Sequence, residues 1–188
     1  MMKRDECLKV LARHRTNEIV VAVYMAAQEW IHIAPNDLNY TFTGAMGQGS
    51  SHALGLALGR PDKRVIVLDG DGSLLMNLGT LVTIANAAPK NYVHCLCENG
   101  TYETNGAVPI PRAGQIRFTE LAKAAGYPKT YEFSSLDEWD RGVPKILKED
   151  GPVFVDLKTE PGEQYPEDFR RLYSIEHRDR FRRALQKS

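Results

Sequence analysis

Short apolar runs rich in β-branched residues alternate with segments of helical periodicity along nearly the whole chain. The runs predict strands at residues 19–23, 39–43, 64–68, 92–96, 130–133 and 152–157. The segments between them predict helices around Leu8 and Leu11 and at 26–33, 50–58, 74–88, 119–125 and 136–147. This alternation is typical of a mostly parallel sheet with crossover helices. The sequence therefore predicts an α/β fold with three α/β/α layers.

The length of 188 residues suits one hydrophobic core, and we expect one domain over residues 1–188. Aromatic residues make up 9% of the chain, and its 15 Gly and 10 Pro are spread along it, which excludes a low-complexity or broadly disordered polymer. No repeat or interdomain linker is visible. Residues 160–188 are expected to form a C-terminal tail that ends in a helix from about Ile175.

The 24 basic and 24 acidic side chains balance, so no overall charge favours nucleic acid or an anionic membrane. The longest apolar run, residues 19–27, is far too short to span a membrane, and no secretory signal is recognisable, so we expect a cytoplasmic protein. Three cysteines, with Cys95 and Cys97 on opposite faces of a predicted strand, argue against a disulfide framework.

The motif Gly70-Asp71-Gly72-Ser73 lies directly between a buried strand and a helix. Ligands of open parallel sheets bind at the carboxyl ends of the strands. Gly72 permits a close backbone approach, and the amides of residues 73–75 at the helix start are expected to attract an anion such as a diphosphate. Asp71 would repel that anion unless a divalent cation such as Mg²⁺ lies between them.

Asn99 strengthens this interpretation, because a lone Gly-Asp-Gly is common in simple turns. It follows the next strand along the chain, 28 positions beyond Asp71. Two parallel strands joined by one crossover bring their carboxyl-terminal loops side by side. The sequence therefore predicts two oxygen ligands, from Asp71 and Asn99, at one edge of the sheet.

The Gly-Asp-Gly, the helix, the strand and Asn99 together resemble the motif of thiamine diphosphate-dependent enzymes. The run from Gly70 to Leu81 resembles the β subunit of sulfopyruvate decarboxylase and phosphonopyruvate decarboxylase. Gly44-Ala45-Met46-Gly47 resembles the Gly-Ser-Met-Gly segment of the same relatives. The resemblance spans most of the chain and implies the thiamine diphosphate-binding fold.

This resemblance implies a role for each matching position. The metal ligands would be Asp71, the Asn99 side chain and the backbone carbonyl of Thr101. The cofactor-binding residues would be Gly44, Met46, Gly70, Gly72, Ser73 and Tyr102. Together they would contact the diphosphate and the aminopyrimidine, hold the cofactor in its bent shape and belong in part to the metal loop. Met46 could instead fill the core. Tyr102 and Glu103 could be solvated loop residues or could contact the substrate.

Some positions depart from the relatives. Residues 25–29 lack the hydroxyl that helps to hold the diphosphate in the family, and Val108 replaces a glutamine, which suggests a less polar substrate. His52 is expected to face the cofactor, a partner or its own helix, whereas His32 and His94 are assigned to structure. No certain catalytic residue is expected in this chain.

The family requires a glutamate that protonates the aminopyrimidine, and that residue belongs to a pyrimidine-binding domain absent here. The resemblance therefore implies the diphosphate-binding β subunit of a two-component 2-oxo acid decarboxylase, with a pyrimidine-binding α subunit in an α2β2 or larger assembly. The cofactors would be thiamine diphosphate and Mg²⁺, and the substrate a small 2-oxo acid. A carboligase of the acetolactate synthase type and a non-catalytic scaffold remain alternatives. A generic Rossmann nucleotide-binding protein is disfavoured, because no Gly-x-Gly-x-x-Gly opens the first crossover helix.

Overall fold

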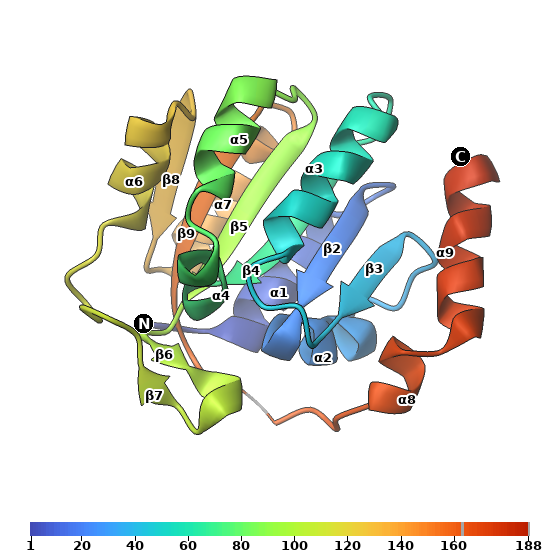
Figure 1. Cartoon of the computed structure of the whole chain (residues 1–188), viewed down its shortest axis with the longest axis horizontal. Helices are drawn as coiled ribbons and strands as arrows, with labels where there is room; N and C mark the ends of the chain where they lie inside the picture. Colours follow the sequence, from blue (N-terminus) through green and yellow to red (C-terminus); the bar gives the residue numbers. More distant parts are fainter. Residues whose placement is uncertain (163, 188) are drawn as a thin grey trace.

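The computed structural model describes residues 1–162 and 164–187. Over these residues the centre of the molecule is a sheet of seven strands whose pairings are all parallel (Figure 1). The strand order is β1-β9-β5-β4-β2-β3, and β8 also pairs with β9. The strands are β1 (Met2–Lys3), β2 (Ile19–Val23), β3 (Asn39–Phe42), β4 (Val65–Gly70), β5 (Tyr92–Glu98), β8 (Lys129–Phe133) and β9 (Val153–Glu160).

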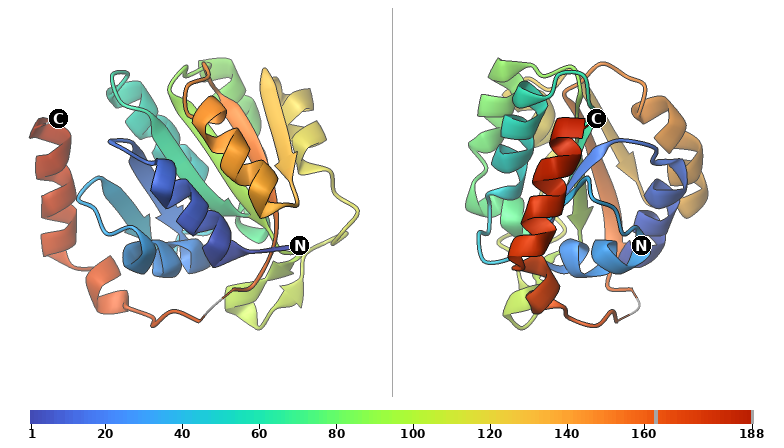
Figure 2. Two further views of the ribbon diagram at one scale, coloured as in Figure 1. Left: turned by 180° about the vertical axis from the view of Figure 1, so that it is seen from behind. Right: turned by 90° about the vertical axis from the view of Figure 1, so that its right-hand side faces the viewer.

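Helices cover both faces of this sheet, as the right-hand view in Figure 2 shows. One face carries α1 (Arg4–His14), α2 (Tyr24–Ile33) and α7 (Leu136–Ile146), and the other carries α3 (Gly49–Gly59), α4 (Asp71–Met76), α5 (Thr80–Ala87) and α6 (Phe118–Ala125). The C-terminal segment adds α8 (Phe169–Leu172) and α9 (Ile175–Lys187), and α9 packs against the edge strand β3. The predicted three-layer α/β/α fold is confirmed.

Strand β2 shows why the apolar runs are continuous. Val20 and Ala22 pack in the core shared with α1, α2 and α7, whereas Ile19 and Val21 pack in the core under α3 and α5. All five residues of the strand are buried. A strand covered on both faces by helices has no solvent-facing side, so its sequence does not alternate between apolar and polar residues.

The connections from β2 and β4 leave the sheet in opposite directions. The chain runs from β2 through α2 to β3 on one side, and from β4 through α4 and α5 to β5 on the other. A crevice forms outside the carboxyl ends of two adjacent strands at such a reversal, and it is the usual ligand position in open α/β sheets. The fold therefore places a crevice directly beside Gly70 and Asp71.

The helix predicted at 74–88 is wrong in its bounds, because it is two helices. The first, α4, begins at Asp71, and α5 begins only at Thr80. Asn77 interrupts the helical path with an extended φ of −147°, and its side chain donates to the Gly47 carbonyl at 3.1 Å. Asn and Gly favour helix ends, and here Asn77 is the C-cap of α4 and Gly79 the N-cap of α5.

Several short elements lie where no strand or helix was predicted. The loop after Asn99 contains a two-stranded hairpin of β6 (Thr101–Tyr102) and β7 (Val108–Pro109), with a 3₁₀ turn at Glu103–Asn105 between them. Strand β1 and helix α8 are two and four residues long. Elements of this length carry no readable periodicity, since less than two turns or repeats are present.

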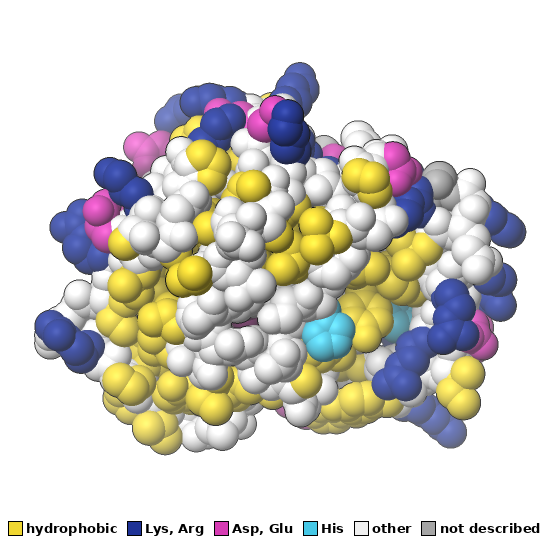
Figure 3. All heavy atoms as spheres, turned by 45° about the horizontal axis from the view of Figure 1, so that its top comes forward, with side chains coloured by type: hydrophobic (Ala, Val, Ile, Leu, Met, Phe, Trp, Pro, Cys, Tyr) yellow, Lys and Arg dark blue, Asp and Glu magenta, His cyan; other side chains and the backbone are white. Residues whose placement is uncertain are grey.

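The outer helical surfaces differ in charge. Neither α3 nor α5 contains Asp, Glu, Lys or Arg, whereas α1 and α7 carry several of each sign. In Figure 3 charged side chains gather around the rim of the visible face, and its middle is uncharged and partly hydrophobic. Leu58, Met76 and Val82 contribute exposed apolar side chains from α3, α4 and α5. Among the described helices, none is long and apolar enough to cross a membrane.

Ala88 offers a test of the helix-end geometry, because it caps α5 in the left-handed conformation at φ 46° and ψ 48°. Its Cβ makes this conformation unfavourable, whereas glycine adopts it without that penalty. We expect Ala88→Gly to raise the free energy of unfolding by about 1 kcal/mol, measured by urea denaturation.

The matched control is Gly126→Ala at the end of α6, where φ is 110° and a Cβ would lie 3.2 Å from the Ala85 Cβ. This substitution should lower the free energy of unfolding by at least about 1 kcal/mol. Equal effects of the same sign from the two substitutions would contradict the assignment.

Candidate functional site

A pocket with about 450 Å³ of empty space, part of which is open solvent, lies at the carboxyl ends of β2, β4 and β5. Its lining brings together eight of the nine metal- or cofactor-binding positions predicted from the sequence: Met46, Gly70, Asp71, Gly72, Ser73, Asn99, Thr101 and Tyr102. The ninth, Gly44, lines a neighbouring pocket instead. Residues far apart in the sequence therefore meet at the edge where the motif spacing placed them.

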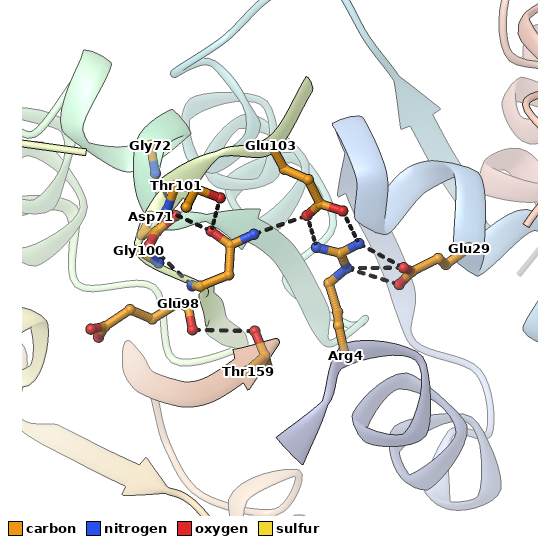
Figure 4. Close-up of polar contacts among 10 residues, drawn as sticks. Arg4, Glu29, Asp71, Gly72, Glu98, Gly100, Thr101, Glu103 and Thr159 are labelled. Atoms are coloured by element: carbon orange, nitrogen blue, oxygen red, sulfur yellow. Dashed lines mark hydrogen bonds and ion pairs between the residues drawn. The ribbon is translucent and has the colours of Figure 1, made fainter. Parts of the chain in front are cut away.

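The Asp71 carboxylate joins the two loops of the site. Its Oδ2 accepts hydrogen bonds from the backbone amide of Asn99 at 3.1 Å and from that of Gly100 at 2.6 Å. Its Oδ1 accepts from the Gly72 amide at 2.8 Å, and Figure 4 shows this cluster. The register pairs Gly70 with Cys97, so β4 and β5 end together and the two loops meet.

Asp71 is only 2% exposed, and burial raises the pKa of its carboxyl, with the backbone hydrogen bonds offsetting this only in part. Within the described chain no ion pair between Asp71 and a Lys or Arg is found. A buried carboxylate without a cationic partner is stabilised by a bound cation. The charge balance at this position therefore fits a metal ion.

The donor atoms of the two loops also fit Mg²⁺, which prefers oxygen ligands and retains water and phosphate oxygens in its coordination sphere. The Asp71 carboxylate, the Asn99 side-chain oxygen and the Thr101 carbonyl are all oxygen donors that line the pocket or its edge. In the part of the chain that the structure describes, no group of three His, Cys, Asp or Glu side chains is arranged for a metal. A metal at this edge would thus depend on the mixed oxygen set.

The Asn99 side chain is held at both of its polar atoms. Its Oδ1 accepts from the Thr101 amide at 2.9 Å and the Thr101 hydroxyl at 3.2 Å, and its Nδ2 donates to Glu103 Oε2 at 2.9 Å. Metal ligation by Oδ1 requires exchange of one Thr101 contact, because an amide oxygen has two lone pairs. The Glu103 contact fixes which end of the amide is the oxygen.

Glu103 in turn belongs to a buried ion network. The Arg4 guanidinium contacts Glu103 at 2.5 Å and Glu29 at 2.7 Å, and Figure 4 shows Arg4 between these two carboxylates. Burial opposes the charge on Arg4, but its hydrogen bonds to both glutamates outweigh this and raise its pKa. Burial raises the pKa of Glu29, and Arg4 offsets this only in part. The network links α1, α2 and the loop after Asn99.

The Gly72 and Ser73 positions form the part of the pocket suited to an anion. Because α4 begins at Asp71, its first-turn amides are those of residues 71–73 and not those of 73–75 as predicted, and among them the Gly72 amide already donates to Asp71 Oδ1. Ser73 Oγ accepts from the Gly47 amide at 3.1 Å, which leaves its own proton available to donate. A Cβ on Gly72 would lie 2.5 Å from the Tyr102 ring, so any larger residue would force that ring to move.

Two further predicted positions lie in the loop between β3 and α3. Met46 lines the pocket, which agrees with a position next to a ligand. Gly44 has a φ of 85° and lies in the neighbouring pocket with Thr43 and Tyr173. The Tyr173 hydroxyl donates to the Thr43 carbonyl at 3.0 Å and so ties this loop to the C-terminal segment.

The histidines of the chain do not line the pocket. His52 is exposed, contacts the Gln48 carbonyl and stacks on Tyr40, so it does not face the pocket, and its possible contact with a partner stays untested. His32 contacts the Pro166 carbonyl at 3.1 Å. His94 is fully buried within the sheet, as its structural assignment predicts.

The two strand cysteines, the two alanines of α2 and Val108 were also singled out in the sequence. Cys95 and Cys97 are buried and free, as strand residues. Ala26 lines the pocket and Ala27 is fully buried behind it, so no hydroxyl reaches the pocket from these two positions. Val108 is 56% exposed on β7 and does not line the pocket, so it gives no support to a less polar substrate.

Several pocket residues escaped the sequence analysis, among them the polar residues Arg4, Tyr24 and Asp69. Glu29, which holds Arg4, was missed as a functional candidate as well. Arg4 lies in a charged N-terminal run typical of a solvated helix start, and no local pattern indicates its burial. Asp69 precedes the motif by one residue and could have been found from its position at the end of β4.

The comparison with protein families agrees with this geometry. The family described as thiamine pyrophosphate enzyme, C-terminal TPP binding domain, matches residues 20–157. Solved structures of the same general fold include benzoylformate decarboxylase from Polynucleobacter necessarius, with a TM-score of 0.69 and 23% identity over 88% of this chain and 34% of that chain. The 4-hydroxybenzoylformate decarboxylase of Rhodococcus jostii RHA1 gives a TM-score of 0.70 and 20% identity over 86% of this chain and 33% of that chain.

Curated relatives are more similar in sequence. Sulfopyruvate decarboxylase subunit beta from Methanocaldococcus jannaschii is 35% identical over 84% of this chain and 83% of that protein. Phosphonopyruvate decarboxylase from Streptomyces viridochromogenes is 33% identical over 79% of this chain but only 37% of that protein. Acetolactate synthase isozyme 1 large subunit from Escherichia coli is 26% identical over 65% of this chain and 24% of that protein. On the family match and these identities, the chain belongs to the thiamine pyrophosphate enzyme family, with the fold of its C-terminal TPP-binding domain.

Proposed function

We propose that this chain is the diphosphate-binding β subunit of a two-component 2-oxo acid decarboxylase that uses thiamine diphosphate and Mg²⁺. The observation that carries the proposal is the junction of the two loops, where the buried Asp71 carboxylate accepts hydrogen bonds from the Asn99 and Gly100 amides inside the pocket. Family membership supports thiamine diphosphate as the ligand of that pocket.

Each group of pocket residues has a distinct task in this proposal. Asp71, Asn99 and the Thr101 carbonyl would hold Mg²⁺, and the Ser73 hydroxyl and first-turn amides of α4 would hold the diphosphate. Gly70 and Gly72 leave room for close approach, and Gly44, Met46 and Tyr102 would contact the rest of the cofactor. Thiamine diphosphate, when bound, supplies the electron sink that lets CO₂ leave a 2-oxo acid.

Arg4 acts in this scheme as a positioning residue. It holds Glu103, and Glu103 holds the Asn99 amide nitrogen, so the orientation of Asn99 depends on a guanidinium from the first helix. Buried, hydrogen-bonded contacts of this kind fix a metal ligand more firmly than an exposed loop would. The network therefore supports a preformed metal loop.

A partner subunit completes the proposal. Three relatives that this chain covers over most of their length are named as beta subunits, whereas it covers about a third of the two solved decarboxylase chains. The uncharged outer surface of α3 and α5 supports a protein contact, because interface cores are depleted of charged residues. The partner would be a pyrimidine-binding α subunit that supplies the catalytic glutamate, in an α2β2 or larger assembly.

A carboligase is the second candidate, favoured by the similarity to acetolactate synthase. The two reactions share the metal and diphosphate residues, and they differ in whether a proton or a second carbonyl compound takes up the acyl group. A non-catalytic scaffold is motivated only by the lack of a hydroxyl at Ala26 and Ala27. Retention of Asp71, Ser73 and Asn99 in one pocket argues against that alternative.

The first prediction concerns activity. We expect no decarboxylation of 2-oxo acids by the isolated chain, because half of the site belongs to the partner, and CO₂ release that needs both subunits, thiamine diphosphate and Mg²⁺. The measurement is CO₂ release from a panel of labelled 2-oxo acids, with and without an acceptor aldehyde. Steady turnover by the isolated chain would contradict the two-subunit proposal, and a condensed product would identify the carboligase.

The second prediction concerns Asp71→Asn. Loss of the negative charge should weaken Mg²⁺-dependent binding of thiamine diphosphate to the assembled complex by at least about tenfold in calorimetry, since one metal ligand becomes neutral. Asp62→Asn is the matched control, because Asp62 is exposed and pairs with Arg60 away from the pocket. Equal affinity of the two variants would refute the assignment of Asp71.

The third prediction concerns Arg4→Met. It should lower the free energy of unfolding by about 3–5 kcal/mol, because Glu29 is left buried without its partner. A second substitution, Glu29→Leu, should recover most of this loss. Arg13→Met on the same helix is the control, with an expected change below about 1 kcal/mol, since the Arg13–Asp140 pair is exposed. Similar losses from both arginines in urea denaturation would rule out a buried network.

A further inference from the structure

A second cavity, which we call the outer cavity, lies between α2 and the segment that follows β9. It has about 770 Å³ of empty space, part of which is open solvent. Arg4, Met25 and Glu103 line both the outer cavity and the pocket that contains Asp71, so the two spaces are direct neighbours. A ligand that extends from the Asp71 pocket past Arg4 and Glu103 would therefore enter the outer cavity.

Gln28 of α2 brings an unused hydrogen-bond donor to this cavity. The residue is only 2% exposed, and its Oε1 accepts a hydrogen bond from the Asp168 backbone amide at 2.9 Å, which identifies the other end of the side-chain amide as the nitrogen. That Nε2 is shielded from solvent and has no hydrogen-bond partner among the described residues. A buried donor without an acceptor is unfavourable.

The position of Gln28 indicates where the acceptor would come from. The residue lines the outer cavity and also the neighbouring pocket that contains Gly44. Since no described side chain or backbone carbonyl accepts from its Nε2, the missing acceptor would belong to an occupant of the cavity. Such an occupant needs an oxygen or another acceptor atom within reach of Gln28.

The charges on the cavity wall restrict what that occupant can be. The described lining carries three carboxylates, from Glu29, Glu103 and Glu167, and one cation, Arg4. Arg4 already contacts Glu29 at 2.7 Å and Glu103 at 2.5 Å, so its charge is shared between two carboxylates of the wall. A ligand group with a negative charge would meet net repulsion from the walls that this chain supplies.

The remaining walls are apolar or aromatic, with side chains from Met25, Pro161 and Tyr165. A group that fits all of these surfaces is uncharged, carries a hydrogen-bond acceptor for Gln28 and has some apolar surface of its own.

We propose that the outer cavity takes the side group of the 2-oxo acid, and that this group is uncharged and bears an oxygen acceptor bonded by Gln28 Nε2. An ester, an amide or an alcohol meets this description. The inference rests on the proposed function and adds the class of substrate. It separates this chain from the relatives named for sulfopyruvate and phosphonopyruvate, whose side groups are acids. Gln28 is then a specificity-determining residue.

The test measures kcat/KM for CO₂ release by the assembled complex with thiamine diphosphate and Mg²⁺. The central pair of substrates is 2-oxoglutarate and its 5-methyl ester, because they differ chiefly in the charge of the side group. We expect kcat/KM for the ester to exceed that for 2-oxoglutarate by at least about tenfold. Sulfopyruvate and phosphonopyruvate are further acidic substrates, and pyruvate is the substrate without a polar side group.

Gln28→Met keeps the length of the side chain and removes the donor. The ratio of kcat/KM for the ester to that for pyruvate should fall about tenfold in this variant, the fold-change of one hydrogen bond. His32→Phe is the matched control, because His32 contacts the Pro166 carbonyl of the same segment but does not line the outer cavity. Its ratio should equal that of the wild type.

A second readout does not depend on turnover. The side-chain amide signals of Gln28, identified by their loss in Gln28→Met, are followed by ¹⁵N NMR in the complex with only this chain labelled. The probe is the 5-methyl ester of 2-hydroxyglutarate, which lacks the reactive 2-oxo group. It should shift the Gln28 signals, whereas lactate, which has no polar side group, should not.

The outcomes separate the inference from the proposed function. Faster CO₂ release from 2-oxoglutarate, sulfopyruvate or phosphonopyruvate than from the ester would overturn the inference and leave the proposed function intact. An unchanged ester-to-pyruvate ratio in Gln28→Met, or unshifted Gln28 signals, would overturn it as well. Absence of CO₂ release from every 2-oxo acid tested would contradict the proposed function and this inference together.

Discussion

The parallel register of β4 and β5 is the constraint on which the site depends. It pairs Gly70 with Cys97, so that both strands end at the same level and their loops meet. The Asp71 carboxylate then accepts hydrogen bonds from backbone amides of its own loop and of the loop that begins at Asn99. A shift of one residue would turn every core side chain of a strand to the opposite face, and the cores on both sides of the sheet forbid it.

Around this junction the charges are arranged in a consistent way. Asp71 is a buried anion with a raised pKa, which a bound cation would stabilise, whereas Glu29 and Glu103 already have their cation in Arg4. Glu103 lines the same pocket as Asp71, but its charge is balanced by Arg4. This division leaves Asp71 as the carboxylate suited to a divalent metal, and it lets Arg4 order the Asn99 loop without neutralising the site.

The sequence predicted most of the fold because buried strands and amphipathic helices have distinct patterns over six or more residues. It placed the strand before Gly70 and the strand before Asn99 at one edge, and eight of the nine predicted positions line one pocket. It failed where local signals are short or tertiary contacts decide. Asn77 ends α4 with a side chain bonded to the Gly47 carbonyl, a contact across 30 positions that no local periodicity contains.

What the sequence by itself determined is the α/β architecture, the family and the pair Asp71 and Asn99, since these follow from periodicity and from motif spacing along one βαβ unit. Only the tertiary structure decided that Arg4 is a buried partner of Glu29 and Glu103, and that Tyr24 lines two neighbouring pockets with a φ of 51°. The physical reason is that burial and side-chain contacts arise between distant segments. An arginine at a helix start and a tyrosine after a strand look the same in sequence whether solvent or protein surrounds them.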